Sequence, residues 1–193
     1  MISFIKGRMV EKTPTEVIIE THGIGYQINI SLHSYSLLPD SEAVELYTYL
    51  QIKEDAHTLY GFVEKFEREL FKLLISVSGI GANTARNMLS YIHPKDLVNA
   101  IASEDVKSIQ AIKGIGLKTA QRVIIDLKEK VIKIYEISEI STPRSNTNAD
   151  EALSALEVLG FVRKSAEKVI QKIVDELPDA SVEDIIKLAL KKL

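Results

Sequence analysis

A short glycine motif occurs twice in this chain of 193 residues, and its chemistry suits phosphate binding. Residues 77–85 align with residues 112–120 at an offset of 35, and Gly, Ile, Gly, Thr and Ala are identical in phase. Glycine permits left-handed backbone and lets a ligand approach closely. A helix that begins after the second glycine presents unpaired N–H groups and the positive end of its dipole. The motif can therefore hold a phosphate diester without contact to a base.

Basic side chains accompany the second copy of the motif. Lys118 and Arg122 are four residues apart, so a helix places them on the same side. Residues 107–133 carry a net charge of +5. The alternative is a pair of helical hairpins whose glycines only make tight turns, and the in-phase repetition favours phosphate binding. The candidate backbone-binding residues are Gly79, Gly81, Ala82, Asn83, Thr84, Gly114, Gly116, Leu117, Lys118, Thr119 and Arg122.

Other kinds of site chemistry find little support in the sequence. The chain has no Cys, which excludes disulfides, thiolate metal sites and cysteine nucleophiles. Its four histidines are far apart and lack carboxylates at metal-ligand spacing, so we predict no metal site. No Ser/His/Asp arrangement and no phosphate loop ending in Gly-Lys-Ser/Thr is present. We therefore expect no catalytic residues and no cofactor.

The first part of the chain, residues 1–63, is predicted to be β-structure. Apolar and polar residues alternate at 26–30 and 45–52, which is typical of half-buried strands. Further strands are expected near 2–10, 15–21 and 57–62, and Ser31 is expected to cap a short helical turn. Five short strands in such a length favour a small closed barrel, most commonly an OB-fold.

The spacing of apolar residues becomes helical from Glu64 onward. Pro94 and Ser103 are expected near the starts of two helices, with Ser103 as an N-cap, and a long helix is expected over 117–135. Residues 138–150 are polar and aperiodic, which predicts a flexible linker. Residues 151–193 predict three short helices. The fold class is therefore α+β multidomain, with 64–137 as the phosphate-binding part.

Composition is consistent with a soluble globular protein, at 46% hydrophobic and 26% charged residues. No apolar run approaches the roughly 18–20 residues of a membrane span. The apolar start of the chain meets Lys6 too early for a signal peptide, so we expect a cytoplasmic protein without a membrane partner. The overall charge of −3 divides into −4 for residues 1–63, +3 for 64–137 and −2 for 138–193. Such asymmetry suits a chain in which only the middle part faces phosphates.

The two glycine motifs resemble the helix–hairpin–helix motif, a sequence-independent binder of the DNA backbone. The order of barrel, tandem motifs, linker and three-helix domain resembles the RuvA family, the Holliday-junction-binding subunits of the bacterial branch-migration complex. The resemblance covers the whole chain. Besides the hairpins it rests on Gly-Ile-Gly-Tyr at 23–26, Lys-Glu-Asp-Ala at 53–56, Leu-Tyr-Gly-Phe at 59–62 and Leu-Gly-Phe at 159–161.

This resemblance implies a non-enzymatic homotetramer that holds a four-way junction open and planar on one face. It implies a hexameric ATPase, RuvB, as the motor for branch migration in recombination and repair, and adds the junction resolvase RuvC as a further partner. Whether one tetramer or two tetramers sandwich the DNA stays open. It also assigns Glu54 and Asp55 to an acidic pin beside the crossover point. Without the resemblance, these two residues are best interpreted as a solvated turn.

The C-terminal domain, residues 151–193, would be a UBA-like module that binds the motor. Four apolar residues are candidates for this contact: Leu156, Leu159, Phe161 and Leu190. The alternative is that they make up the core of the domain itself. One departure from the family affects the first hairpin, where Asn83 stands in place of a lysine. Arg86 could compensate only if it points to the same side.

Two other functions are considered beside junction binding. A DNA repair enzyme with helix–hairpin–helix motifs, of the glycosylase or nuclease type, would need a buried catalytic Lys or Asp or a carboxylate cluster, and neither is recognisable. A single-strand-binding adaptor that acts through the OB-fold would need a basic barrel with exposed aromatic residues. The barrel is acidic, and we expect Tyr47 and Tyr49 to pack against a neighbouring domain or subunit.

Overall fold

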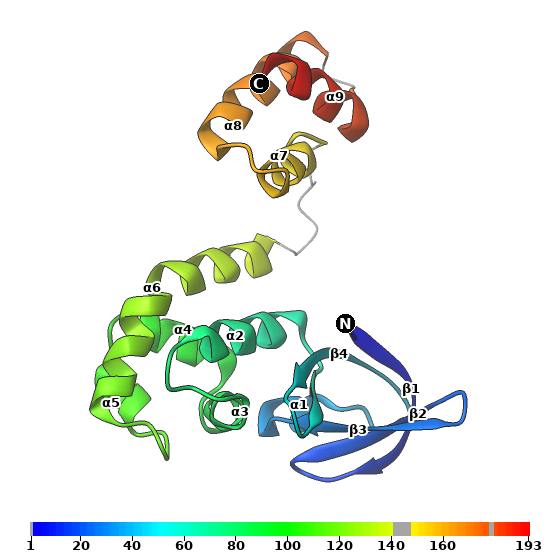
Figure 1. Ribbon diagram of the computed structural model, residues 1–193, viewed down its shortest axis with the longest axis vertical. Helices are drawn as coiled ribbons and strands as arrows, with labels where there is room; N and C mark the ends of the chain where they lie inside the picture. Colours follow the sequence, from blue (N-terminus) through cyan, green and yellow to red (C-terminus); the bar gives the residue numbers. More distant parts are fainter. Residues whose placement is uncertain (1, 141–147, 178–179) are drawn as a thin grey trace. The chain divides into compact units, whose positions relative to one another are not determined.

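The computed structural model describes residues 2–140, 148–177 and 180–193. The chain forms two compact units, residues 1–139 and residues 140–193 (Figure 1). The first unit contains a β-barrel followed by helices, and the described residues of the second form three helices. Among the described helices, none is both long and apolar enough to cross a membrane.

Five strands form a closed barrel at the start of the first unit. They are β1 (Phe4–Lys12), β2 (Glu16–Thr21), β3 (Ile24–Ile30), β4 (Ala43–Ile52) and β5 (His57–Phe62). The strand order is β1-β2-β3-β5-β4, with β3 and β5 parallel and the other pairs antiparallel. Ile28 and Ile30 point into the barrel core, as the alternation in the sequence predicts. The expected barrel of the OB-fold type is confirmed.

A short helix, α1 (Leu32–Leu37), joins β3 to β4. Ser31 begins it as predicted, because its hydroxyl accepts a hydrogen bond from the backbone N–H of Ser34.

The remaining helices of the first unit are α2 (Lys65–Ser76), α3 (Ala82–Tyr91), α4 (Pro94–Ala102), α5 (Val106–Gln110) and α6 (Leu117–Ile140). They enclose a core to which the barrel strand β5 also contributes. The ring of Phe71 on α2 lies 5.2 Å from the ring of Tyr60 and 5.0 Å from that of Phe62. The helices and the barrel wall therefore share one apolar core, which fixes them to each other.

The expected N-cap at Ser103 is wrong. Ser103 ends α4, and its hydroxyl donates to the carbonyl of Asn99 at 2.7 Å. Asp105 begins α5 instead, because its carboxylate accepts from the N–H and the hydroxyl of Ser108. These hydrogen bonds hold the pKa of Asp105 below its ordinary value.

The bounds predicted for the linker, 138–150, are also wrong at both ends. The helix α6 was expected to end near Tyr135 but continues to Ile140, and α7 (Asn148–Val158) begins before the linker was expected to end. The middle part, 141–147, lies outside the described residues.

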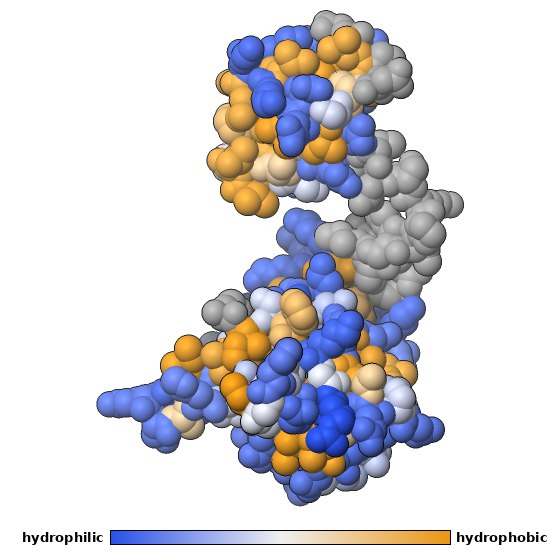
Figure 2. Space-filling model, turned by 90° about the vertical axis from the view of Figure 1, so that its right-hand side faces the viewer, coloured by the Kyte–Doolittle hydropathy of each residue, from blue (hydrophilic) through white to orange (hydrophobic). Residues whose placement is uncertain are grey.

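The second unit consists of α7, α8 (Arg163–Glu176) and α9 (Val182–Lys192). Gly160 follows α7 with a φ of +96°, and Ser181 caps α9 by accepting from the N–H of Asp184. The predicted three helices are confirmed. Their core is formed by Ala152, Leu153, Leu156, Ala166, Ile170, Ile173, Ile185 and Ala189. Apolar surface remains on the outside of this unit (Figure 2).

Candidate nucleic-acid interface

The two glycine motifs have the same backbone geometry. Gly79 has a φ of +94° and Gly114 has a φ of +92°, a region that favours glycine. The isoleucine that follows each of them is buried and donates its N–H to the carbonyl three residues earlier, at 3.1 Å for Ile80 and 3.0 Å for Ile115. A helix then starts at Ala82 in the first hairpin and at Leu117 in the second. The sequence repeat is therefore a structural repeat.

Both hairpins leave backbone N–H groups at the start of the helix without an acceptor in that helix. The first helical hydrogen bonds run from Ala85 to Gly81 and from Ala120 to Gly116, each at 2.9 Å. The N–H groups of residues 82–84 and 117–119 therefore have no acceptor within their own helix. A side chain added at Gly81 or Gly116 would meet nothing within 4 Å. The space beside both glycines is therefore open, although Ala82, the first residue of α3, is itself buried.

The basic residues of the second hairpin differ in their surroundings. Lys118 is exposed in the first turn of α6. Arg122, one turn further, donates from Nη1 to the carbonyl of Ser78 at 3.3 Å and remains exposed. Because Ser78 lies in the first hairpin, Arg122 joins the two motifs. Sequence spacing places Lys118 and Arg122 on one side of α6, but it gives no sign of this bridge.

The first hairpin is attached to the barrel by polar side chains. Asn83 is exposed, and its Oδ1 accepts from the phenol of Tyr60 at 3.1 Å. Arg86 donates from Nη1 to the carbonyl of Thr15 at 3.2 Å and to Oδ1 of Asn29 at 2.9 Å. Arg86 is thus engaged with the barrel and does not take the place of the missing lysine. Thr84 is half-buried.

Glu54 and Asp55 lie at the tip of the turn between β4 and β5, and both are exposed. The N–H of Lys53 donates to the carbonyl of Ala56 at 2.8 Å, which closes the turn. The two carboxylates therefore project from the end of a paired β-hairpin.

A buried carboxylate that sequence reasoning missed lies between the barrel and the helices. Glu67 on α2 accepts hydrogen bonds from the hydroxyls of Ser31 and Ser34, at the start of α1. Burial raises the pKa of Glu67, while the two hydroxyls oppose the shift. The sequence did contain a sign that Glu67 is buried. It falls on the apolar stripe of α2, one turn before the buried residues Leu70 and Phe71.

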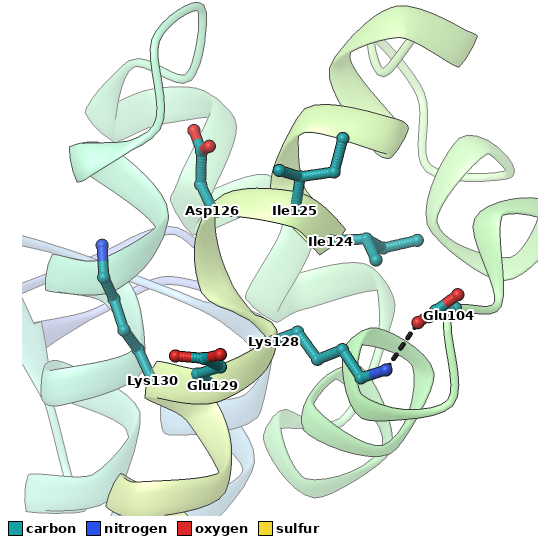
Figure 3. A pocket seen from close by; sticks show the side chains of 7 residues that line it. All are labelled: Glu104, Ile124, Ile125, Asp126, Lys128, Glu129 and Lys130. Carbon is teal, nitrogen blue, oxygen red and sulfur yellow. Dashed lines mark hydrogen bonds and ion pairs between the residues drawn. The ribbon is translucent and has the colours of Figure 1, made fainter.

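A surface hollow of about 300 Å³ lies along α6 (Figure 3). Lys128 forms an ion pair with Glu104, and Ile125 is 79% exposed beside them. The lining residues are Glu104, Ile124, Ile125, Asp126, Lys128, Glu129 and Lys130. This lining has no nucleophile paired with a base. Among the described residues, no group of three His, Cys, Asp or Glu is placed to hold a metal ion.

The four apolar candidates of the C-terminal unit do not share one environment. Leu156 is fully buried in the core of the unit, so its expected role as a contact for a partner is wrong. Phe161 is half-buried and packs against the same core. Leu159 is 59% exposed and Leu190 is 45% exposed. Sequence reasoning missed two neighbours that are more exposed than these, Val158 and Val162.

Three family models match successive parts of the chain. Residues 1–61 match the RuvA N terminal domain, and residues 71–129 match a SAM-like helix-hairpin-helix tandem. Residues 147–193 match the RuvA C-terminal domain.

Curated proteins are similar to this chain over its full length. A protein of Flavobacterium psychrophilum is 67% identical and one of Christiangramia forsetii is 63% identical, each over 100% of both chains. A protein of Bacteroides fragilis is 47% identical, again over 100% of both chains. Each of these relatives is named Holliday junction branch migration complex subunit RuvA.

Proposed function

Because this chain belongs to the RuvA family, we propose that it binds four-way junction DNA as a subunit of a branch-migration complex. The observation that carries the proposal is the pair of hairpins with equal geometry, each with N–H groups that lack a helical acceptor next to a glycine in open space. Two such sites in one compact unit, bridged by Arg122, can hold two phosphates. Phosphate contacts position a protein on DNA but carry no sequence information. We therefore expect junction binding without sequence preference.

The contact at each hairpin would be a hydrogen bond from backbone N–H groups to a phosphate oxygen. The positive end of the helix dipole favours the anion at that place. In the second hairpin, the exposed ammonium group of Lys118 adds a full charge. We assign the same eleven residues to this interface as the sequence does. They are Gly79, Gly81, Ala82, Asn83 and Thr84 in the first hairpin, and Gly114, Gly116, Leu117, Lys118, Thr119 and Arg122 in the second.

Glu54 and Asp55 would act as the acidic pin. A carboxylate and a phosphate about 4 Å apart repel each other by roughly 1–4 kcal/mol for effective dielectric constants between 80 and 20. In a homotetramer, the Glu54 and Asp55 carboxylates of all subunits would lie around the centre of the junction. The pin would then keep the strands apart through repulsion alone.

The C-terminal unit would recruit the motor, a hexameric ATPase of the RuvB type. Leu159 and Leu190 are exposed and suit an apolar contact with a partner. ATP hydrolysis would then lie in the motor, and this chain would be non-enzymatic. The junction resolvase RuvC and a second tetramer on the other face of the DNA are the further partners of this proposal. Its DNA substrate would place the protein in the bacterial cytoplasm.

The two other functions considered receive less support. A single-strand-binding barrel needs free aromatic faces, but the ring of Tyr49 lies 5.4 Å from that of Phe71, and Arg68 covers the ring of Tyr47 at 5.3 Å. A repair enzyme needs a catalytic cluster. The buried carboxylate of Glu67 does not supply one, because both of its oxygens accept hydrogen bonds from serine hydroxyls between the barrel and the helices. Glu67 also precedes both hairpins in the sequence.

A competition gel shift tests the proposal. Labelled four-way junction is bound by the full-length protein and is challenged with unlabelled junction, linear duplex or single strand of equal nucleotide content. We expect the junction to compete at concentrations at least tenfold lower than the duplex, and two junctions of unrelated sequence to compete equally. Equal competition by junction and duplex would overturn the proposal, and preference for the single strand would favour the adaptor function.

A further inference from the structure

One face of α3 is attached to the barrel side by hydrogen bonds along its whole length. Asn83, Arg86 and Ser90 are spaced by three and four residues, so they share a face of this helix. Ser90 accepts at Oγ from the N–H of Leu32, at 3.0 Å, and so extends the contacts of the other two. We call this set the polar seam. Its partners on the barrel side are Thr15, Asn29, Leu32 and Tyr60.

The seam bond nearest to the first hairpin fixes the orientation of the Asn83 amide. Tyr60 is 2% exposed and its ring packs against that of Phe71, so its phenol has little freedom. The phenol donates to Oδ1 of Asn83. Since Oδ1 and Nδ2 lie on opposite sides of a planar amide, Nδ2 is turned away from Tyr60. In the part of the chain that the structure describes, no acceptor contacts this Nδ2, and Asn83 is exposed.

Tyr60 remains a donor over the working range of pH. Burial raises the pKa of its phenol, and the nearby guanidinium of Arg86 only partly opposes this shift. The phenol therefore keeps its proton at neutral pH and can donate it to the amide oxygen of Asn83. A free asparagine side chain would instead present its oxygen or its NH₂ group to an approaching anion.

Asn83 and Lys118 occupy equivalent places in the two hairpins, because the repeat offset is 35 residues. Each is the second residue of the helix that follows its glycine motif. The first hairpin thus has a neutral donor at the place where the second has a cation. Repulsion between the amide oxygen and a phosphate is avoided only if the NH₂ group faces the DNA.

We propose that Tyr60 is a positioning residue that turns the NH₂ group of Asn83 toward the DNA backbone, so that the residues at the helix start of the first hairpin meet phosphate with neutral donors, while the cation Arg122, which contacts Ser78, comes from α6. The inference rests on the proposed junction binding and deepens it. It makes the two hairpins unequal: the second releases counterions through Lys118, whereas the Asn83 side chain contributes affinity without adding a cation.

A set of exposed-site variants tests this inference in the full-length protein. Junction affinity is measured by fluorescence anisotropy with labelled four-way junction over a series of salt concentrations. We expect Asn83→Ala to weaken binding roughly fivefold for each contacted phosphate, the loss of about one neutral hydrogen bond, with the salt slope unchanged. We expect Asn83→Asp to weaken binding more, because it keeps the acceptor for Tyr60 but presents an anion to the phosphate. Asn83→Lys should bind more tightly, with a slope steeper by about 0.9 per contact.

The role of Tyr60 is isolated by a double-mutant cycle. Tyr60→Phe keeps the ring and removes only the hydroxyl that orients Asn83. We expect it to weaken junction binding about twofold to threefold when Asn83 is present, and to have no further effect in the Asn83→Ala protein. An effect of equal size in both backgrounds would mean that Tyr60 acts only on the fold, and it would overturn the inference. An Asn83→Ala protein that binds like the wild type would do the same.

The unmodified protein separates this inference from the proposed function. If the wild type does not prefer the junction to duplex in the same anisotropy titration, the proposed function fails. If the wild type prefers the junction and the cycle shows no coupling, only the role of Tyr60 fails.

Discussion

Lys118 is the side chain that should dominate the electrostatics of the second hairpin. It is exposed in the first turn of α6, beside N–H groups that have no helical acceptor. We expect Lys118→Ala to weaken junction binding and to lower the slope of log K against log salt by about 0.9 for each phosphate that the ammonium group neutralises. Binding titrations between low and physiological salt measure this slope. Lys133→Ala, which removes an exposed lysine further along α6, is the matched control. A slope unchanged by Lys118→Ala would contradict the assignment.

Glu67 should give the protein a recognisable pH dependence of stability. Burial raises the pKa of its carboxyl above the ordinary value of 4.5. The folded state therefore binds this proton more tightly than the unfolded state, so the group stabilises at low pH and this contribution is lost as pH rises through the folded pKa. We expect Glu67→Gln to remove this loss and to flatten the profile of unfolding free energy above about pH 4.5. Denaturant unfolding at a series of pH values measures it. Glu42→Gln, at an exposed position, should leave the profile unchanged.

At the level of single residues, the sequence predicted local features but not contacts between distant parts of the chain. The glycines, Lys118 and the acidic turn were identified because local chemistry and spacing define them. The contact between Tyr60 and Asn83, the direction of Arg86 and the burial of Leu156 depend on residues far apart in the chain or on the helix packing. Apolar spacing says that a side chain is on the inner face of a helix, but not whether the domain or a partner covers it.

At the scale of elements, periodicity predicted the strands, the helices and the barrel. The errors occurred where several neighbouring residues have the same chemistry. Ser103, Glu104 and Asp105 can all favour a helix start, and the end of α4 decides among them. Glu104 has a φ of +59° there, so the chain turns between the two helices and leaves Asp105 as the cap. The end of α6 was missed because Ser138 and Glu139 begin a mostly polar stretch, although polarity alone does not end a helix.

The two glycines of the second hairpin should differ in their roles. Gly114 has a φ of +92°, whereas Gly116 is outside the left-handed region, and a side chain at either would meet nothing within 4 Å. We expect Gly114→Ala to lower the free energy of unfolding by about 1–2 kcal/mol, because only its backbone is strained. Gly116→Ala should cost less stability but weaken junction binding, since its methyl group would stand before the open N–H groups. Denaturant unfolding and junction titration of both variants distinguish these effects. Equal loss of stability in the two variants would contradict the argument.

The acidic turn should control selectivity and not affinity. Glu54 and Asp55 project from the tip of the β4–β5 hairpin, where nothing in the described chain neutralises them by an ion pair. A junction has an open centre that can receive them, whereas continuous duplex would press phosphates against them. We expect Glu54→Gln with Asp55→Asn to strengthen duplex binding relative to junction binding by about fivefold or more, since repulsion of roughly 1–4 kcal/mol is removed and each 1.4 kcal/mol is about a factor of ten. Competition gel shifts measure this ratio. A double variant that loses junction affinity and gains none for duplex would contradict the repulsion mechanism.

At the scale of the whole molecule, the proposed DNA binding and the proposed recruitment of the motor belong to different compact units. The hairpins, the acidic turn and the polar seam all belong to the first compact unit, and the second unit has its own core. The net charge follows the same division, because residues 138–193 carry −2 and would be repelled by phosphates. The sequence analysis treated 1–63 and 64–137 as separate domains, whereas the barrel and the hairpin helices form one compact unit, and it did not predict which apolar residues of the second unit remain exposed.

Removal of the second unit should therefore leave DNA binding intact and abolish motor-driven migration. The truncation belongs after Ile140, where α6 ends, so that this helix is complete. We expect the truncated protein to bind junction with unchanged affinity, and to support no branch migration when the RuvB-type motor and ATP are added. Because a truncation removes everything beyond α6, full-length Leu159→Asp with Leu190→Asp gives a sharper test: both residues are exposed, so the fold should persist while migration is lost. Migration by either protein, or loss of junction binding by the truncated one, would mean that the second unit has a different role.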